Sequence, residues 1–256
     1  MKLRHRLLAD ALHAAHAWVE RAGAIAPGTR LGDQFGHLGE GSCIAFPVLT
    51  LFGTGCMHIG AGTMVGRRVA LSVGYGPDDP NAPERGLVIG ERCVIGARAT
   101  VTAHASVVIG DDVWFGMDVF VSDANHGYQD PHTPIGLQFG RHDPVRIGSG
   151  SWIGHGAVIL PGTSIGRNVV VGAGSVVRGT VPDHSVVVGS PARVVRRWEP
   201  GLGWVSVRSA EGGAAGTADM GAADIGAGGG AVDRDDDVLP VLSTAEVAAA
   251  VGLFRA

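Results

Sequence analysis

Residues 147–177 read IGSGSWIGHGAVILPGTSIGRNVVVGAGSVV and contain a repeat of six residues that recurs through much of the chain. An aliphatic or aromatic residue starts each hexad, and glycine follows it in ten of twelve hexads. The fifth position of every hexad holds a small or β-branched residue. The hexads start at residues 59, 65, 89, 95, 101, 109, 115, 147, 153, 159, 165 and 171.

This period predicts short strands wound into a coil. An α-helix with 3.6 residues per turn cannot keep a strict period of six on one face. Strands joined by tight turns can, with the first and fifth side chains pointing inward and the glycine at the bend. Stacked hexads then form a three-sided prism of parallel strands in which each coil buries what its neighbour cannot bury alone. We therefore expect an all-β fold, a parallel β-helix, over residues 28–198.

Composition excludes several classes of protein. The chain has 42 glycines among 256 residues, but 45% of its residues are hydrophobic, which excludes collagen and wholesale disorder. The first 200 residues are nearly neutral, so no basic surface for nucleic acid is indicated. The three cysteines lack a CxxC spacing, and no apolar run is long enough to span a membrane. We expect a cytoplasmic protein without integral membrane association.

Both ends of the chain depart from the hexads. Residues 3–22 have apolar residues at helical spacing and predict an amphipathic helix within an N-terminal segment 1–27. We expect this helix to pack against the body, where it would cap one end of the prism, or against a partner subunit; a membrane-surface helix is the alternative. Residues 199–256 are rich in glycine, alanine and acidic residues, which predicts a disordered tail, with capping-box spacing for a short helix at Ser243.

The hexads are interrupted between Val121 and Ile147 by more than one coil, so a loop over residues 122–146 must protrude. Long loops on a rigid scaffold often carry function. His126 in this loop is a candidate general base, because imidazole exchanges a proton near neutral pH. Asp123 and Asn125 could orient its ring or the acceptor; the alternative is that they are turn residues bonded to local backbone.

The hexads resemble those of the hexapeptide-repeat acyltransferases, whose fold is a left-handed parallel β-helix. The loop sequence Asp-Ala-Asn-His at 123–126, followed by Pro-Ile at 134–135, is similar to that of the sugar O-acetyltransferase branch, which includes maltose, galactoside and exopolysaccharide acetyltransferases. The resemblance implies acetyl-CoA as acyl donor and a saccharide hydroxyl as acceptor, with direct transfer assisted by His126. It also implies a homotrimer in which the donor groove and the catalytic loop come from adjacent subunits.

The same resemblance suggests residues for coenzyme A. It places Trp152 along the pantetheine arm and Ala173 where a small side chain lets that arm approach the backbone; a packed exterior aromatic is the alternative for Trp152. It places basic side chains near the phosphates, which here are Arg193 and Arg196, with Arg178 and Arg197 as further candidates. Relatives often hold the acceptor with a polar residue one coil before the catalytic histidine. His104 lies at that height, but it could equally be a solvated turn residue, which leaves the acceptor open.

Two other readings of the fold remain. A zinc hydratase like the gamma-class carbonic anhydrases would need three histidines, and His104, His126, His132 and His155 supply enough of them. A non-catalytic scaffold would need only the hexads, because these specify shape and not chemistry. We favour acyl transfer, expect no metal, and leave open whether an amine replaces the hydroxyl and whether the acyl chain is longer than acetyl.

Overall fold

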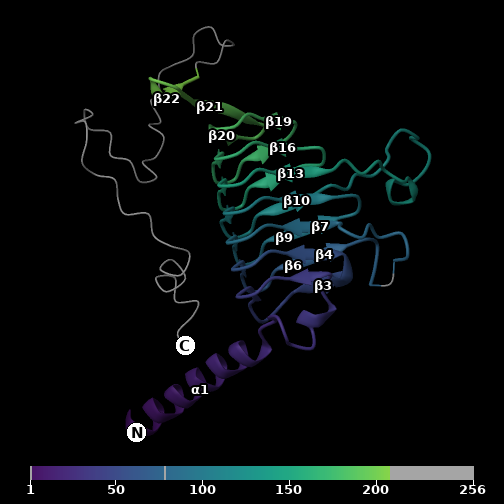
Figure 1. Ribbon diagram of the computed structural model, residues 1–256. Coiled ribbons are helices and arrows are strands. Elements are labelled where there is room, and N and C mark those ends of the chain that lie inside the picture. The colour runs from purple at the N-terminus through teal and green to yellow at the C-terminus, as the bar shows by residue number, and fades with distance from the viewer. Residues whose placement is uncertain (1, 78, 208–256) are drawn as a thin grey trace. The chain divides into compact units, whose positions relative to one another are not determined.

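The structure, a computed structural model, describes residues 2–77 and 79–207, with side chains from residue 5 onward. Its body consists of short strands in three sheets, which we name A, B and C (Figure 1). Sheet B contains β1 (His37–Leu38), β4 (Met57–Ile59), β7 (Leu87–Ile89), β10 (Val107–Ile109), β13 (Val145–Ile147), β16 (Ser164–Ile165) and β19 (Thr180–Val181). Sheet A contains β2 (Cys43–Ile44), β5 (Met64–Val65), β8 (Val94–Ile95), β11 (Trp114–Phe115), β14 (Trp152–Ile153), β17 (Val170–Val171), β20 (Ser185–Gly189), β21 (Ala192–Glu199) and β22 (Gly203–Ser206). Sheet C contains β3 (Thr50–Phe52), β6 (Ala70–Val73), β9 (Thr100–Ala103), β12 (Phe120–Ser122), β15 (Val158–Ile159) and β18 (Val176–Val177).

The chain visits sheets B, A and C in turn, and each such circuit is one coil of the predicted left-handed β-helix. Strands pair in parallel with the strands one coil above and below, as in the register of Ile109 with Ile147 and of Ile147 with Ile165. Among the strands of the described residues, the antiparallel pairs are β20 with β21 and β21 with β22, at the end of sheet A. The expected fold class is confirmed.

The core contains the side chains that the hexads predict. All twelve hexad starts are buried, and Phe115, the largest of them, is only 4% exposed. The fifth positions are buried as well, apart from the half-buried Ala105. Large aliphatic residues on the strands and small residues near the bends therefore fill the interior together, which explains how the chain packs with few aromatics.

The turns from sheet A to sheet C form the A–C corner, and the turns from sheet C to sheet B form the C–B corner. The A–C corner is tight: a Cβ added at Gly154 would lie 2.6 Å from the backbone nitrogen of Ala173 in the next coil. The C–B corner instead accommodates insertions at residues 53–56, 74–86, 104–106 and 123–144, the first of which includes the 3₁₀ turn η2 (Thr54–Cys56). Irregular segments from successive coils therefore meet at the C–B corner.

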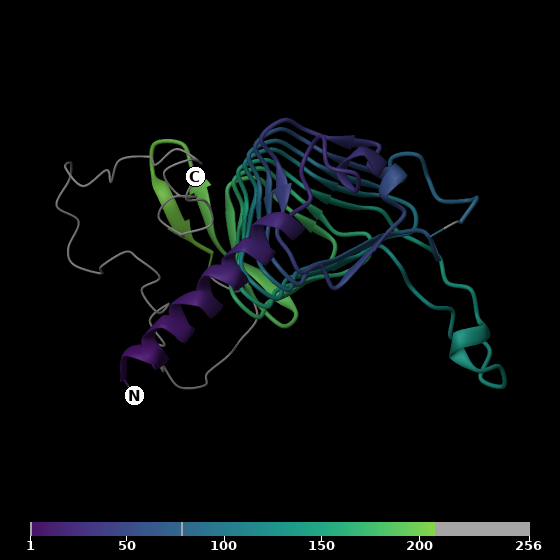
Figure 2. The same ribbon diagram turned by 90° about the horizontal axis from the view of Figure 1, so that it is seen from below.

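The N-terminal helix forms as predicted, but only its last turns pack against the body, and it does not cap the prism as we expected; packing of the remaining turns against a partner subunit stays a prediction. Helix α1 (Lys2–Gly23) runs away from the prism (Figure 2), and residues 5–16 are exposed. Its last turns contact the prism, where Glu20 pairs with Arg67 at 2.7 Å. The first coil is covered by the segment after the helix, which contains η1 (Gly32–Gln34), because Ile25 and Phe35 are buried in the core. No helix among the described residues is both long and apolar enough to cross a membrane.

The ordered body extends beyond the boundary expected at residue 198. Strand β22 pairs with β21, and the rings of Trp198 and Trp204 meet edge to face with centroids 5.9 Å apart. Gly201 and Gly203 adopt positive φ in the turn that joins these strands, a conformation that glycine adopts without strain. The remainder of the expected tail, residues 208–256, including the short helix predicted at Ser243, lies outside the described residues.

Candidate active site

The long loop predicted from the break in the hexads leaves the prism after β12, returns at β13 and projects from the C–B corner (Figure 2). Its outgoing and returning segments pair at one bridge, between His126 and Phe139, and Gly127 N–H donates to the Gln138 carbonyl at 3.1 Å. The tip contains η3 (Ile135–Leu137). The loop is therefore a narrow excursion whose two segments support each other close to His126.

His126 and Asn125 are exposed on the outgoing segment of the loop. The returning segment passes very close to them, because a Cβ at Gly140 would lie 1.8 Å from the Asn125 carbonyl oxygen. An exposed imidazole at this place can reach a substrate that lies beside the loop. The catalytic roles of His126 and Asn125 stay predictions.

Asp123, at the base of the loop, has a different environment. Its side chain is fully buried, and its carboxylate accepts three backbone N–H groups, from His104 at 2.8 Å, Ala105 at 2.8 Å and Ser106 at 2.7 Å. This geometry supports the alternative reading of Asp123 as a turn residue, which here binds the turn of the preceding coil. Its action on the His126 ring stays a prediction.

His104 is neither a solvated turn residue nor isolated. Its side chain is 13% exposed, its ring stacks on His142 with centroids 4.8 Å apart, and the Tyr75 ring contacts it edge-on at 4.6 Å. The Tyr75 hydroxyl and His142 Nε2 are 2.5 Å apart and hydrogen-bonded. Burial and then His142 lower the pKa of His104, while Asp123 and Asp79 oppose the shift. The neutral ring is thus favoured.

Tyr75 and His142 were not singled out from the sequence. They lie 67 residues apart, in two different insertions. The sequence signal was that both insertions interrupt the hexads after a strand of sheet C, which places them at the same corner of successive coils.

Trp152 lies on the outer face of sheet A, 41% exposed, directly beside Trp114 of the preceding coil. The two indoles line a shallow groove together with Asp112, Gly150 and Ser151. Trp114 was missed, although both tryptophans immediately precede a hexad start in sheet A. Ala173 is exposed at the A–C corner, one coil above Gly154. An aromatic surface and an open turn therefore lie near each other on this side of the prism.

Two of the predicted arginines share that face of sheet A. Trp152 pairs with Val170, Val170 with Val186, and Val186 with Arg196, so one row of outward side chains leads from the indole to a guanidinium. Arg193 pairs with the exposed Val188 on the same face. Directly opposed residues in neighbouring strands point to the same side of a sheet. The structure thus brings Arg193 and Arg196 into line with Trp152.

The other two arginines lie apart from this row. Arg178 is exposed at the C–B corner, directly after β18. Arg197 pairs with Ser185, whose side chain is buried on the inner side of sheet A. Roles for all four arginines in binding phosphate stay predictions.

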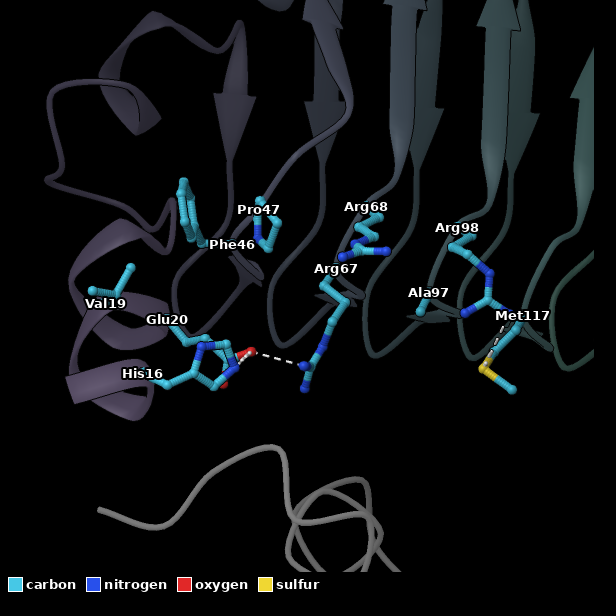
Figure 3. A pocket seen from close by; sticks show the side chains of 10 residues that line it. All are labelled: His16, Val19, Glu20, Phe46, Pro47, Arg67, Arg68, Ala97, Arg98 and Met117. Carbon is cyan, nitrogen blue, oxygen red and sulfur yellow. Dashed lines mark hydrogen bonds and ion pairs between the residues drawn. The ribbon is translucent and has the colours of Figure 1, made fainter. Parts of the chain in front are cut away.

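A separate hollow lies where α1 meets the A–C corner (Figure 3). The Glu20 carboxylate at its edge contacts Arg67 at 2.7 Å and His16 at 3.3 Å. None of the residues lining this hollow comes from the loop 123–144. They are His16, Val19, Glu20, Phe46, Pro47, Arg67, Arg68, Ala97, Arg98 and Met117.

The four histidines considered for zinc are not gathered at one place. His104 lies at the C–B corner, whereas His155 lies at the A–C corner with its Nδ1 3.7 Å from Asp118. Within residues 2–77 and 79–207, no group of three or more histidine, cysteine, aspartate or glutamate side chains is placed to hold a metal ion. A zinc site would therefore require residues from more than one copy of the chain or a rearrangement of the loop.

Comparisons with known proteins agree with this architecture. Residues 144–179 match the family described as bacterial transferase hexapeptide (six repeats), and residues 86–122 match the hexapeptide repeat of succinyl-transferase. WbbJ of Escherichia coli K12, which carries the name of a lipopolysaccharide biosynthesis O-acetyl transferase, is 39% identical over 87 residues, 31% of this chain and 44% of WbbJ. Rv3034c of Mycobacterium tuberculosis, named as an acetyltransferase, is 44% identical over 85 residues, 33% of this chain and 28% of that protein.

These matches span less than half the length of either relative. Among solved structures, a variant of AntD, an N-acyltransferase from Bacillus cereus in complex with dTDP and coenzyme A, superposes with a TM-score of 0.56 at 20% identity. That superposition covers 67% of this chain and 90% of AntD. At this identity the likeness concerns the fold.

Proposed function

We propose that this chain, whose residues 86–122 and 144–179 match hexapeptide-repeat transferase families, transfers an acetyl group from acetyl-CoA to a hydroxyl group of a saccharide. The observation that carries the proposal is the exposed His126 on a loop that the prism itself does not need. The aromatic groove at Trp152 and the arginines in line with it support binding of the donor.

The proposed reaction is a single displacement. His126 takes the proton of the acceptor hydroxyl while the oxygen attacks the thioester carbonyl of acetyl-CoA. A backbone N–H stabilises the oxyanion of the tetrahedral intermediate. The intermediate then collapses with cleavage of the carbon–sulfur bond, the acetyl group stays on the acceptor oxygen, and the imidazolium returns its proton to the leaving thiolate. His126 ends neutral and ready for the next cycle.

Direct transfer is favoured over an acyl-enzyme because Cys43 and Cys93 are poor nucleophiles and no cysteine lies beside His126. Burial raises the pKa of Cys93 to about 11 and also raises the pKa of Cys43. Thiols with raised pKa values are largely protonated near neutral pH and react slowly. None of the three cysteines lies in the loop that carries His126.

A saccharide hydroxyl is the favoured acceptor because of the loop sequence at 123–126 and the name of the relative WbbJ. The acceptor groups that compete with it are amines, which the same base could deprotonate. A panel of sugars and nucleotide sugars, each with a hydroxyl or an amine at the same position, separates the two.

One chain does not bring the two halves of the proposed site together. Trp152 and Ala173 lie on sheet A and at the A–C corner, and the loop with His126 leaves from the C–B corner, so that sheet C lies between them. In a threefold assembly, the C–B loop of one copy can reach the A–C corner of the next. We therefore propose a homotrimer with its sites at the subunit interfaces.

The test is the release of coenzyme A thiol from acetyl-CoA in the presence of the acceptor panel, with the wild-type chain and His126→Ala side by side. The proposal expects turnover with at least one saccharide and a loss of roughly a thousandfold in the variant, a typical contribution of a general base. A folded His126→Ala variant with near-normal turnover would refute the mechanism. Zinc bound at one ion per chain, with activity lost to a chelator, would favour the hydratase, and coenzyme A binding without turnover would favour the scaffold.

A further inference from the structure

Three aromatic side chains from successive coils meet at the C–B corner. Tyr75 comes from the insertion 74–86, His104 from the turn of the next coil, and His142 from the returning end of the loop. The His104 and His142 rings stack, and both contact the Tyr75 ring, with centroids 4.6 Å and 5.8 Å from it. These contacts connect the loop to segments 67 and 38 residues away, where nothing in the hexads requires a connection.

The returning segment that carries His142 also supports His126. The His126 backbone bridges to Phe139, and Gly127 donates to the Gln138 carbonyl at 3.1 Å. Gly140 packs directly against the Asn125 carbonyl. A shift of His142 relative to the prism would therefore move Phe139 and Gly140, and with them the backbone of His126.

The two ends of the loop are fastened at the same point. The buried Asp123 carboxylate binds the backbone of residues 104–106, and the Asp123 carbonyl accepts the Asp143 N–H at 2.8 Å. Asp123 fixes where the loop departs. Backbone bonds fix its return at Asp143, which also accepts the Gly162 N–H at 2.9 Å, and the His142 side chain adds a second attachment next to it. Of these two attachments, the one at His142 depends on side-chain contacts alone.

The cluster is buried on the side of the two imidazoles and open to solvent at Tyr75, which is 66% exposed. The Nδ1 atoms of both His104 and His142 are buried and have no hydrogen-bond partner among the described residues. The Tyr75 hydroxyl supplies the hydrogen bond at the other ring nitrogen of His142. Without that hydroxyl, both nitrogens of His142 would lack a partner inside the cluster, an arrangement that favours release of the ring to water.

We infer that Tyr75, His104 and His142 are positioning residues, forming a clamp that holds the returning end of the loop against the prism and thereby fixes His126. The catalytic part of this inference rests on the proposed function. The mechanical part does not, because it concerns only the attachment of the loop.

The mechanical part is tested by limited proteolysis with trypsin. Arg141, next to His142, has a side chain that is 88% exposed, so the bond between these residues is cut when the segment detaches. The chain has two tyrosines, and Tyr128, 73% exposed on the outgoing segment of the loop, provides the matched control. We expect Tyr75→Phe to raise the rate of this cut by roughly fivefold, as followed by mass spectrometry, and Tyr128→Phe to leave it at the wild-type rate.

His142→Phe tests the same hydrogen bond from its other side while keeping an aromatic ring for stacking. We expect it to accelerate the cut to a similar degree, and we expect the double variant with Tyr75→Phe to be no faster than either single variant, because both remove one interaction. Cleavage at the wild-type rate in Tyr75→Phe and in His142→Phe would overturn the clamp. This result does not depend on any enzymatic activity.

The catalytic part is tested on the same proteins by acetyl transfer. We expect Tyr75→Phe and His142→Phe to lower kcat several-fold and to leave the KM for acetyl-CoA unchanged, because none of the residues that line the groove on sheet A belongs to the loop or to the clamp. Faster cleavage combined with an unchanged kcat would overturn the positioning of His126 and leave the clamp intact. A wild-type chain without transferase activity would refute the proposed function, and the proteolysis result would still decide the clamp.

Discussion

Removing the Asp123 carboxylate is expected to destabilise the β-helix strongly. Asp123→Ala leaves three partly buried backbone N–H groups, those of His104, Ala105 and Ser106, without an acceptor. Each orphaned donor costs about 1–3 kcal/mol, and water admitted by the smaller side chain keeps the cost near the lower limit, so we expect a loss of about 4 kcal/mol. For a domain of this size, 1 kcal/mol lowers Tm by about 2–4 °C, which gives a decrease of about 8–16 °C.

Asp123→Asn and Asp111→Ala make this prediction specific. The asparagine keeps one acceptor oxygen but turns an amide toward backbone donors, so we expect about half the loss. Asp111 is the control, since its exposed carboxylate accepts a single backbone bond from Glu91 at 2.8 Å, and its removal should cost about 0.5–1 kcal/mol. Thermal unfolding followed by calorimetry measures all three. If Asp123→Asn kept its Tm but lost kcat, the carboxylate would act on His126 in the reaction, contrary to our reasoning.

Three further predictions concern the loop and the assembly. His126→Ala and Ala173→Trp should each be inactive alone, and mixed trimers of the two variants should recover about a quarter of wild-type activity. In such trimers about a quarter of the interfaces pair an intact loop from one copy with an intact groove from its neighbour. No recovery would place the site within one chain. Burial lowers the pKa of His104 in the attached state, so as the pH falls the His104 ring binds a proton in the detached state first. The clamp should therefore be fully stable above about pH 6.5 and weaken as the pH falls below it. Hydrogen exchange in residues 123–144, corrected for intrinsic rates, should then rise between pH 7.5 and pH 5.5, and a flat profile would contradict this. Gly140→Ala should separate the loop segments beside His126 and lower kcat at least tenfold, whereas Gly136→Ala, which meets no atom within 4 Å, should not.

The sequence predicts the prism well because its period is a direct consequence of packing. A residue such as Ile153 is inward-facing by its position in the hexad alone, and every coil repeats the same requirement. The helix at residues 3–22 was predicted for the same reason, since helical spacing is local. Its position was not, because the contacts at Glu20 and Phe46 depend on where the chain turns after Gly23.

The candidate site was harder to predict because its residues lie in insertions, which do not follow the six-residue repeat. His126 could be selected from its loop and from the family resemblance, but the contacts of Asp123, Tyr75 and His142 could not. These three residues act on segments of other coils, and the lengths of the insertions decide which segments meet. Trp114 was in principle available, since it occupies the hexad position of Trp152 one coil earlier.

The A–C corner and the C–B corner differ in how closely successive turns stack, and this difference explains why the insertions lie at the C–B corner. At the A–C corner, each turn stacks so closely on the next that a Cβ at Gly116 would lie 2.6 Å from the His155 backbone, so an extra residue there would separate the coils and expose the core. At the C–B corner, a long insertion is tolerated if its two ends are held together, because the coil above then stacks as though the insertion were absent. Asp123 and Asp143 provide that closure: their backbones are bonded at 2.8 Å, and β13 continues directly on β10. A loop closed in this way leaves the stacking of the prism undisturbed, and the coils beneath it give His126 the fixed position that its proposed role as a general base requires.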